Sequence, residues 1–279
     1  MRNKVIGLFD SGLGGLTVVR RVRERLADVG LLYFADQKHV PYGDRTPEDL
    51  YELLKANLAW LDERGVRAIV MACNTSCAIA DRYGWPPTNA EVFDLLDAAT
   101  IALQHAQAQR IGVVATAATV ASGAYGRRIR NAIAGAEVWE VAAPELVPLV
   151  EAGLIESDEA RDAVAHACAE LPADLDAVVY GCTHYPVLWQ HFTTALGTRV
   201  LLIDPAIVQA ERVADFLALD EPARATGVTH YVTTGDPEKF RISVRALMKE
   251  ELSEESAALT LEFDGRSQGG AAVGRVGFH

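Results

Sequence analysis

The stretch that decides the fold runs from residue 5 to residue 16 and reads VIGLFDSGLGGL. An apolar run, Val5–Phe9, ends in a polar, glycine-rich turn, and a segment of helical periodicity, Leu16–Leu26, follows. A short apolar run bounded by polar or glycine residues is typical of a strand buried on both faces of a parallel sheet. The stretch therefore predicts a strand, a turn and a helix, the opening units of an α/β fold.

The same alternation continues along the chain and predicts βαβ units. Further strands are expected at Leu31–Phe34, Ala68–Met71, Ile111–Val114, Ala177–Tyr180 and Val200–Ile203. Further helices are expected at Pro47–Glu63 and Ser157–Glu170. Thr46 is a suitable N-cap for the first of these helices, since proline and two acids follow it.

A weak internal sequence similarity suggests that the chain has two similar halves. In one half, strands lead into Asp10-Ser11-Gly12 and Ala72-Cys73-Asn74-Thr75; in the other, they lead into Ala115–Thr119 and Gly181-Cys182-Thr183-His184. Ligands of open α/β sheets bind at the carboxyl ends of strands, where these polar turns lie. We expect two lobes meeting at a cleft, each a mainly parallel sheet flanked by helices. The expected limits are 1–95 with 207–252 for the Cys73 lobe, 96–206 for the Cys182 lobe, and 253–279 for a mobile tail.

Composition excludes several classes of protein. The chain has 279 residues and a net charge of −12, and it has no long Lys/Arg run, which argues against nucleic-acid binding. No apolar run is long enough to span a bilayer, and the apolar stretch near the N-terminus is too short for a signal peptide. We therefore expect a cytoplasmic protein whose four cysteines stay reduced.

Two of the cysteines are candidate catalytic thiols. A free cysteine is most often a small buried hydrophobic residue, which is how we interpret Cys77 and Cys168. Cys73 and Cys182 instead close apolar strands and precede polar residues, a position in which helix N-termini and nearby cations favour the thiolate. His184, two residues after Cys182, could supply such a cation or act as an acid itself.

Cofactor and metal sites are less well supported, and we expect neither. The glycine-rich turn after Asp10 resembles a dinucleotide fingerprint, but its third glycine is replaced by Thr17 and an acid precedes it. We expect the free N–H groups of this turn to hold an anion. No C-x₂-C pair indicates zinc, and no lysine lies beside a phosphate-binding glycine loop, as pyridoxal phosphate would need.

Two further polar segments could bind a small acid. The turn Val40-Pro41-Tyr42-Gly43 can offer backbone N–H groups, and Thr116 and Thr119 can offer hydroxyls after a strand. Ordinary turn and N-cap chemistry explains the same residues equally well.

Taken in order, the motifs resemble those of glutamate racemases in the aspartate/glutamate racemase superfamily. The resemblance covers residues 5 to about 215. It rests on Asp10–Val18, Val40–Gly43, Ala72–Thr75, Ala118–Val120 with Ser122–Tyr125, Val147–Glu151 and Gly181–Pro186.

The resemblance implies a cofactor-independent racemase that interconverts L- and D-glutamate with two cysteine bases and supplies D-glutamate for peptidoglycan synthesis. A homodimer is compatible with it. The implied catalytic residues are Cys73, Cys182, Asp10, His184 and Glu151, with Asp10 assisting Cys73 and His184 assisting Cys182. The implied substrate-binding residues are Ser11, Pro41, Tyr42, Gly43, Asn74, Thr75, Thr116, Thr119 and Thr183.

The chain also departs from the family pattern. Glu91–Leu96 replaces an Ile-Glu-Pro-Gly stretch, Ala35-Asp36-Gln37 replaces Gly-Asp-Thr, and Ala143-Pro144-Glu145 replaces a Cys-Pro-Leu run. Two alternatives therefore stay open: a racemase for aspartate or another amino acid, and a catalytically idle relative that binds an amino acid.

Overall fold

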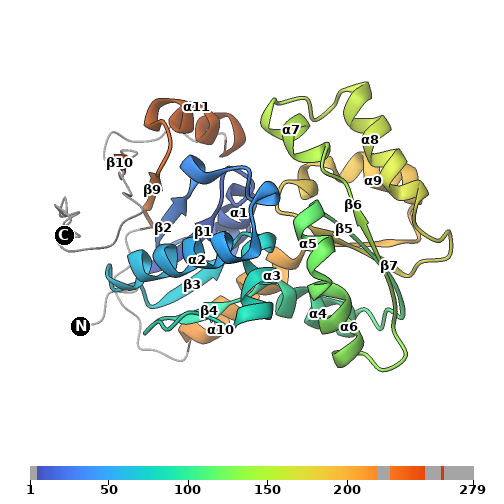
Figure 1. The fold of residues 1–279 in the computed structure, drawn as a ribbon, viewed down its shortest axis with the longest axis horizontal. Helices are drawn as coiled ribbons and strands as arrows, with labels where there is room; N and C mark the ends of the chain where they lie inside the picture. The colour runs from blue at the N-terminus through green and yellow to red at the C-terminus, as the bar shows by residue number, and fades with distance from the viewer. Residues whose placement is uncertain (1–4, 219–226, 249–258, 261–279) are drawn as a thin grey trace.

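The computed structural model describes residues 5–218, 227–248 and 259–260 (Figure 1). Its strands are β1 (Val5–Asp10), β2 (Gly30–Ala35), β3 (Ala68–Met71), β4 (Glu91–Phe93), β5 (Arg110–Ala115), β6 (Glu137–Ala142), β7 (Ala177–Gly181), β8 (Leu201–Ile203), β9 (Thr229–Thr233) and β10 (Leu259–Thr260). Its α-helices are α1 (Leu16–Arg25), α2 (Pro47–Asp62), α3 (Asn74–Tyr83), α4 (Leu95–His105), α5 (Ala117–Ser122), α6 (Ala124–Ala132), α7 (Leu146–Glu151), α8 (Asp158–Ala169), α9 (Trp189–Leu196), α10 (Pro205–Ala218) and α11 (Pro237–Met248). Short 3₁₀ turns lie at Gln37–His39, Tyr42–Asp44 and Tyr185–Leu188.

The described strands form two separate parallel sheets flanked by helices, which confirms the expected α/β fold class. The first sheet has the order β10-β9-β2-β1-β3-β4 and the second has the order β6-β5-β7-β8. Every strand pair in both sheets is parallel. Figure 1 shows the sheets side by side, with α3 and α5 between them.

All six expected strands are present, and their ends differ from the predicted ones by at most one residue. The three expected helices are also confirmed, and the Thr46 hydroxyl accepts a hydrogen bond from the Asp49 N–H as an N-cap. Four strands were not foreseen: β4, β6, β9 and β10. β6 lies at a sheet edge and has only two buried residues, Val138 and Val141, and β4 has only three residues, so neither is a continuous apolar run.

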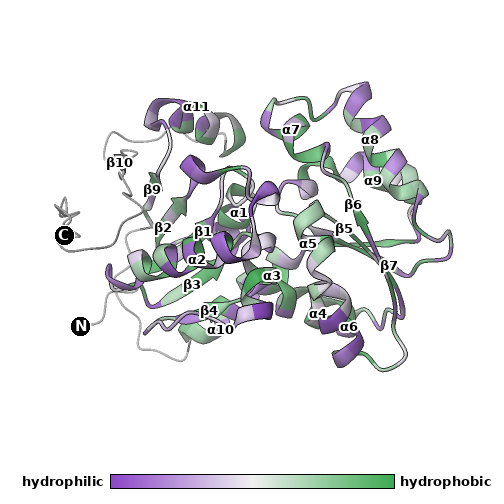
Figure 2. Cartoon of the chain, in the orientation of Figure 1, coloured by the Kyte–Doolittle hydropathy of each residue, from purple (hydrophilic) through white to green (hydrophobic). Residues whose placement is uncertain are grey.

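The core lies between the sheets and their helices. Residues of β1, β3 and β7 are almost all buried, and the hydrophobic colour in Figure 2 runs along the central strands. Cys77 and Cys168 are buried among apolar side chains, as expected of core residues. The chain returns from the second sheet to the first through α10, where the Gln209 amide donates to the carbonyls of Met71 and Phe93.

The carboxyl ends of the central strands of the two sheets face each other. The Thr17 hydroxyl donates to the Thr183 carbonyl at 2.8 Å, and the Thr75 and Thr119 hydroxyls lie 3.3 Å apart. These contacts bring the polar turns of both halves together. The expected lobe limits stay a prediction, and the expected tail lies outside the described residues except for Leu259–Thr260.

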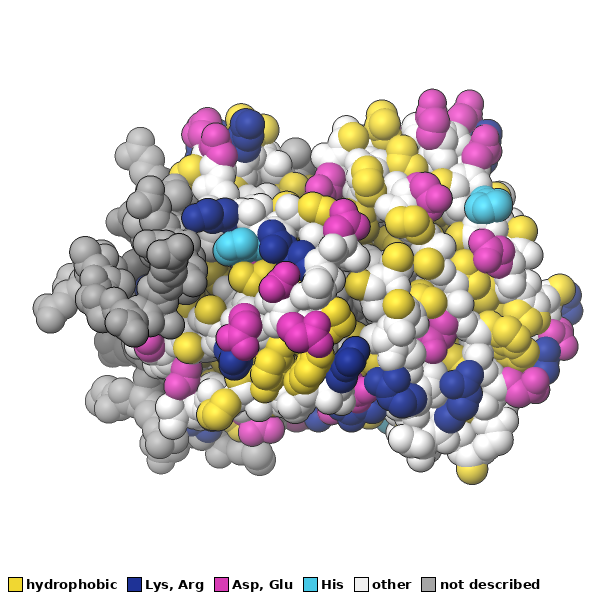
Figure 3. Space-filling view, viewed as in Figure 1, with side chains coloured by type: hydrophobic (Ala, Val, Ile, Leu, Met, Phe, Trp, Pro, Cys, Tyr) yellow, Lys and Arg dark blue, Asp and Glu magenta, His cyan; other side chains and the backbone are white. Residues whose placement is uncertain are grey.

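The surface is mixed in charge. On the face drawn in Figure 3, acidic and basic side chains are interspersed with apolar ones. Among residues 5–218, 227–248 and 259–260, no helix is both long and apolar enough to cross a membrane.

Candidate active site

Asp10 ends β1 and is held by the turn that follows it. Its Oδ2 accepts hydrogen bonds from the N–H groups of Gly12 at 3.2 Å and Gly15 at 2.7 Å. Burial raises the pKa of this carboxyl above its ordinary value, and the positive charge of His184 and these N–H groups oppose the rise. The expectation that free N–H groups of this turn hold an anion is therefore wrong for Gly12 and Gly15, whose N–H groups are taken by the side chain of Asp10.

The glycines of this turn are needed for space. A Cβ on Gly14 would lie 2.3 Å from Nδ1 of His184, and a Cβ on Gly15 would lie 2.6 Å from Cβ of Asp10. Neither glycine has a positive φ, so the requirement is close approach rather than unusual backbone geometry. The glycine-rich turn of the first half therefore packs directly against the His184 segment of the second.

Cys73 lies where β3 ends and α3 begins. Its Sγ donates a hydrogen bond to the Ser11 hydroxyl at 3.6 Å. Burial, and then the negative charge of Asp10, raise the pKa of the Cys73 thiol to about 11, although hydrogen bonds with Ser76 and Ser11 oppose the rise. At neutral pH this group is a protonated thiol.

Cys182 lies at the corresponding end of β7, in a different environment. Its Sγ is 3.6 Å from Nδ1 of His184, and Nε2 of the same ring is 3.1 Å from the Glu151 carboxylate. The sulfur and the ring are buried, whereas the side chain of Glu151 is 38% exposed. Glu151 thus links a buried cysteine–histidine pair to solvent.

His184 keeps its positive charge at neutral pH. Burial disfavours the charged ring, but hydrogen bonds with Cys182 and Glu151 and the charge of Asp10 outweigh burial and raise the pKa of His184 to about 10. An imidazolium next to a sulfur favours the thiolate form of a cysteine.

A cluster of hydroxyl and amide groups lies beside the two cysteines. Thr116 caps α5, its hydroxyl donates to that of Thr119 at 2.9 Å, and Thr75 approaches both at 3.3 Å. Asn74, directly after Cys73, accepts a hydrogen bond from the buried Tyr125 hydroxyl. Such groups can hold the carboxylates and the ammonium group of an amino acid.

The Val40–Gly43 turn adjoins this cluster. The Tyr42–Asp44 turn contacts α5, and Val40 lies near Gly12. Tyr42 is buried, and its hydroxyl donates to Asp36 at 2.6 Å, whereas the space next to Gly43 is open. Pro41, between them, follows a cis peptide bond.

Sequence reasoning did not identify three polar residues that support this site. Tyr33 donates to the Gly12 carbonyl at 2.8 Å, Asp36 binds Tyr42 and Thr234, and Tyr125 binds Asn74. Tyr33 reads as a core strand residue, and Tyr125 was noticed only as part of a motif. The one available signal was Tyr33 within an apolar run, because a buried hydroxyl needs a partner.

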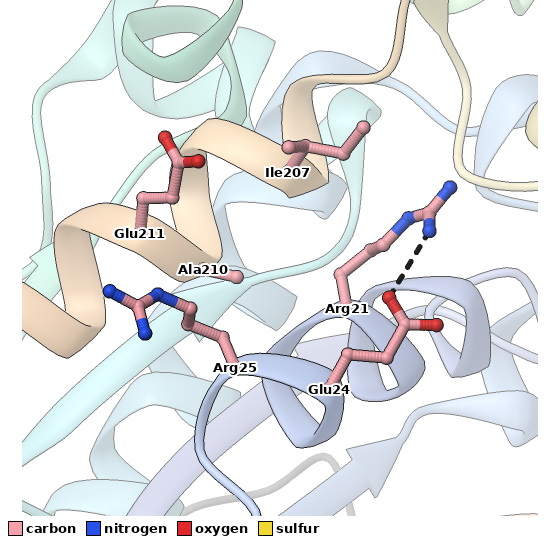
Figure 4. A pocket seen from close by; sticks show the side chains of 6 residues that line it. All are labelled: Arg21, Glu24, Arg25, Ile207, Ala210 and Glu211. Carbon is pink, nitrogen blue, oxygen red and sulfur yellow. Dashed lines mark hydrogen bonds and ion pairs between the residues drawn. The ribbon is translucent and has the colours of Figure 1, made fainter.

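The described part of the chain has no group of three His, Cys, Asp or Glu side chains arranged to hold a metal ion. A surface pocket occurs elsewhere, between α1 and α10 (Figure 4). Arg21 lines it and pairs with both Glu24 and Asp204 at 3.2 Å. No residue expected in the active site lines this pocket.

Comparison with protein families gives a match over most of the chain. The model of the Asp/Glu/Hydantoin racemase family matches residues 6–213. A glutamate racemase of Gloeobacter violaceus is 41% identical over 237 residues, which cover 85% of this chain and 89% of that protein.

Solved structures agree with this match. The glutamate racemase of Thermus thermophilus, in complex with β-chloro-D-alanine, has a TM-score of 0.79 and 34% identity, covering 93% of this chain and 97% of the other. The glutamate racemase of Francisella tularensis, in complex with D-glutamate, has a TM-score of 0.84 and 25% identity, covering 95% and 100%.

Proposed function

Because the chain belongs to the Asp/Glu/hydantoin racemase family, we propose that it is a glutamate racemase that moves the α-proton between Cys182 and Cys73 without a cofactor. The observation that carries the proposal is the pair of thiols at matching strand ends, one beside an imidazolium and one held as a thiol. Racemisation needs a base on one face of the α-carbon and an acid on the other, and this pair supplies both.

In the proposed reaction, the Cys182 thiolate removes the α-proton from one face of the substrate. The electrons of the broken C–H bond pass into the carboxylate, and the Cys73 S–H then delivers its proton to the opposite face. The product has inverted configuration, Cys182 carries the abstracted proton, and Cys73 is left as a thiolate. The opposite enantiomer reacts with this second form, or proton exchange with solvent restores the first.

Hydrogen-bond donors lower the barrier by holding the negative charge that develops on the carboxylate. The amide of Asn74 and the hydroxyls of Thr75, Thr116, Thr119 and Thr183 are the donors we assign to the two carboxylates. The charge of Asp10 acts on Cys73, whose pKa it raises, and on His184, whose charged form it favours. Glu151 maintains the charge of His184.

Glutamate is the proposed substrate because the relatives over most of the chain are named glutamate racemases, one of them solved with D-glutamate. We propose that the product D-glutamate supplies peptidoglycan synthesis. Cytoplasmic location and homodimeric assembly stay predictions.

The test is incubation of the purified protein, without added cofactor, with each enantiomer of glutamate and of aspartate in deuterated water. We expect glutamate to racemise faster at equal subsaturating concentrations, although one methylene group is typically worth only about 1–3 kcal/mol. Early product should carry deuterium at the α-carbon while the remaining substrate stays unlabelled. Faster turnover of aspartate than of glutamate would contradict the proposed substrate. If the protein racemises no amino acid at all, the proposed activity is wrong.

A further inference from the structure

The buried hydroxyl of Tyr125 touches the residue next to one of the cysteines. Tyr125 lies in the first turn of α6, flanking the second sheet, and Asn74 begins α3, directly after Cys73 at the end of the first sheet. The hydroxyl oxygen is 2.5 Å from Oδ1 of Asn74. The ring of Tyr125 is fully buried, and Asn74 is only 4% exposed.

The direction of this hydrogen bond follows from what else the hydroxyl can reach. Within residues 5–218, 227–248 and 259–260, the Tyr125 hydroxyl makes no other hydrogen bond. If it accepted from the Asn74 amide nitrogen, its own proton would be buried without a partner, which is costly. The hydroxyl therefore donates, and Oδ1 of Asn74 is the atom that faces it.

Because Oδ1 of Asn74 faces Tyr125, the Nδ2 group of the same amide points away from Tyr125. The Nδ2 group of Asn74 donates no hydrogen bond to any residue that the structure describes, and it is not among the fully buried polar atoms that have no partner. An N–H₂ group that is free, and held in one orientation beside Cys73, is suited to a carboxylate oxygen.

We infer that Tyr125 is a positioning residue, whose hydroxyl holds the Asn74 amide with its N–H donors turned toward a substrate carboxylate. This inference rests on the proposed function and adds a residue to it. Since the two residues flank different sheets, the amide is oriented only when the two halves are in contact, which links closure of the halves to binding beside Cys73.

The experiment is steady-state kinetics of Tyr125→Phe, with wild type measured first. The variant keeps the ring and loses one hydrogen bond, and the Asn74 amide can then rotate. We expect KM for glutamate to rise about three- to tenfold, as for the loss of one oriented hydrogen bond, with a smaller change in kcat. The pH profile should be unchanged, because the thiols and His184 keep their partners.

The matched control is Tyr180→Phe, which makes the same chemical change on β7. The Tyr180 hydroxyl is buried and has no hydrogen-bond partner among the described residues, so this variant should keep the wild-type KM. A thermal melt of both variants separates lost stability from lost orientation.

A double-mutant cycle with Asn74→Ala completes the test. If Tyr125 acts through Asn74, adding Tyr125→Phe to Asn74→Ala should raise KM no further. Unchanged KM in Tyr125→Phe, or an equal additional rise in the Asn74→Ala background, would overturn the inference while leaving the proposed activity intact. Failure of the wild type to racemise glutamate would instead overturn the proposed function.

Discussion

The environments of Cys73 and Cys182 differ although their positions in the fold are alike. Each cysteine follows the last residues of a buried parallel strand and precedes polar residues. Cys73 has a hydroxyl partner and a nearby carboxyl, and its pKa is raised to about 11. Cys182 has a charged imidazole, which a carboxylate holds from the other side.

In the proposed reaction, this difference lets two similar halves perform opposite proton transfers. A symmetric site with two thiols or two thiolates would lack either the base or the acid. In the proposed mechanism, the imidazolium of His184 beside one sulfur separates the two roles before the substrate arrives. Substitutions that each remove one element of this asymmetry should have effects that decrease from the cysteines to His184 and then to Glu151.

Cys73→Ala and Cys182→Ala should each lower kcat/KM for racemisation by at least about 10³-fold, since each removes an acid/base group that the other cannot replace. The two variants should differ in exchange of the α-proton with deuterated water. Cys73→Ala keeps the thiolate and should still exchange one enantiomer at neutral pH. Cys182→Ala should exchange the α-proton of the opposite enantiomer about 10²-fold more slowly, because Cys73 is mostly protonated at neutral pH.

Cys168→Ala is the control for these variants, because Cys168 lies in the α8 core away from the site. It should keep nearly full activity. Racemisation at the wild-type rate by either Cys73→Ala or Cys182→Ala would show that the two-thiol account is wrong.

His184→Gln should lower kcat/KM about 10²-fold at neutral pH, because Cys182 loses the charge that favours its thiolate. The difference between this variant and wild type should narrow at alkaline pH, because His184 is charged below its pKa and loses its charge as the pH rises through about 10. His166→Gln, at an exposed position, is the control for pH–rate profiles. Identical profiles for wild type and His184→Gln would contradict the role of His184.

Glu151→Gln should have the smallest effect, a loss of about three- to tenfold, because the amide can still accept from the ring but carries no charge. The Glu151 hydrogen bond raises the pKa of His184, so its weakening should move the alkaline limb to lower pH. The test is to measure the pH–rate profiles of Glu151→Gln and of wild type and to compare their alkaline limbs. A shift of that limb to higher pH would contradict the assigned direction.

The sequence predicted the sheets better than the electrostatics of the site. Strands such as Ala68–Met71 and Ala177–Gly181 are continuous apolar runs, so they could be recognised without their neighbours. The β6 strand, with Glu137 and Glu140 among its six residues, could not, because it has neither a continuous apolar run nor a regular alternation of polar and apolar residues.

The candidate cysteines could be found because each precedes polar residues at a strand end. Their differing protonation could not be found, since it depends on partners distant in the chain. Ser11 lies 62 residues from Cys73, and Glu151 lies 33 residues from His184. Tyr125 lies 51 residues from Asn74, so its contact likewise appears only once both halves are folded.

The proposed division of roles, with Cys182 as the thiolate and Cys73 as the thiol before substrate binds, can be tested by the ultraviolet absorbance of thiolates. Burial raises the pKa of Cys168 to about 12 and that of Cys77 well above its ordinary value, so neither should contribute at neutral pH. The absorbance of the free enzyme at neutral pH should correspond to one thiolate, which Cys182→Ala removes and Cys73→Ala leaves in place. Loss of that absorbance in Cys73→Ala but not in Cys182→Ala, or no thiolate at all in the wild type, would contradict the account.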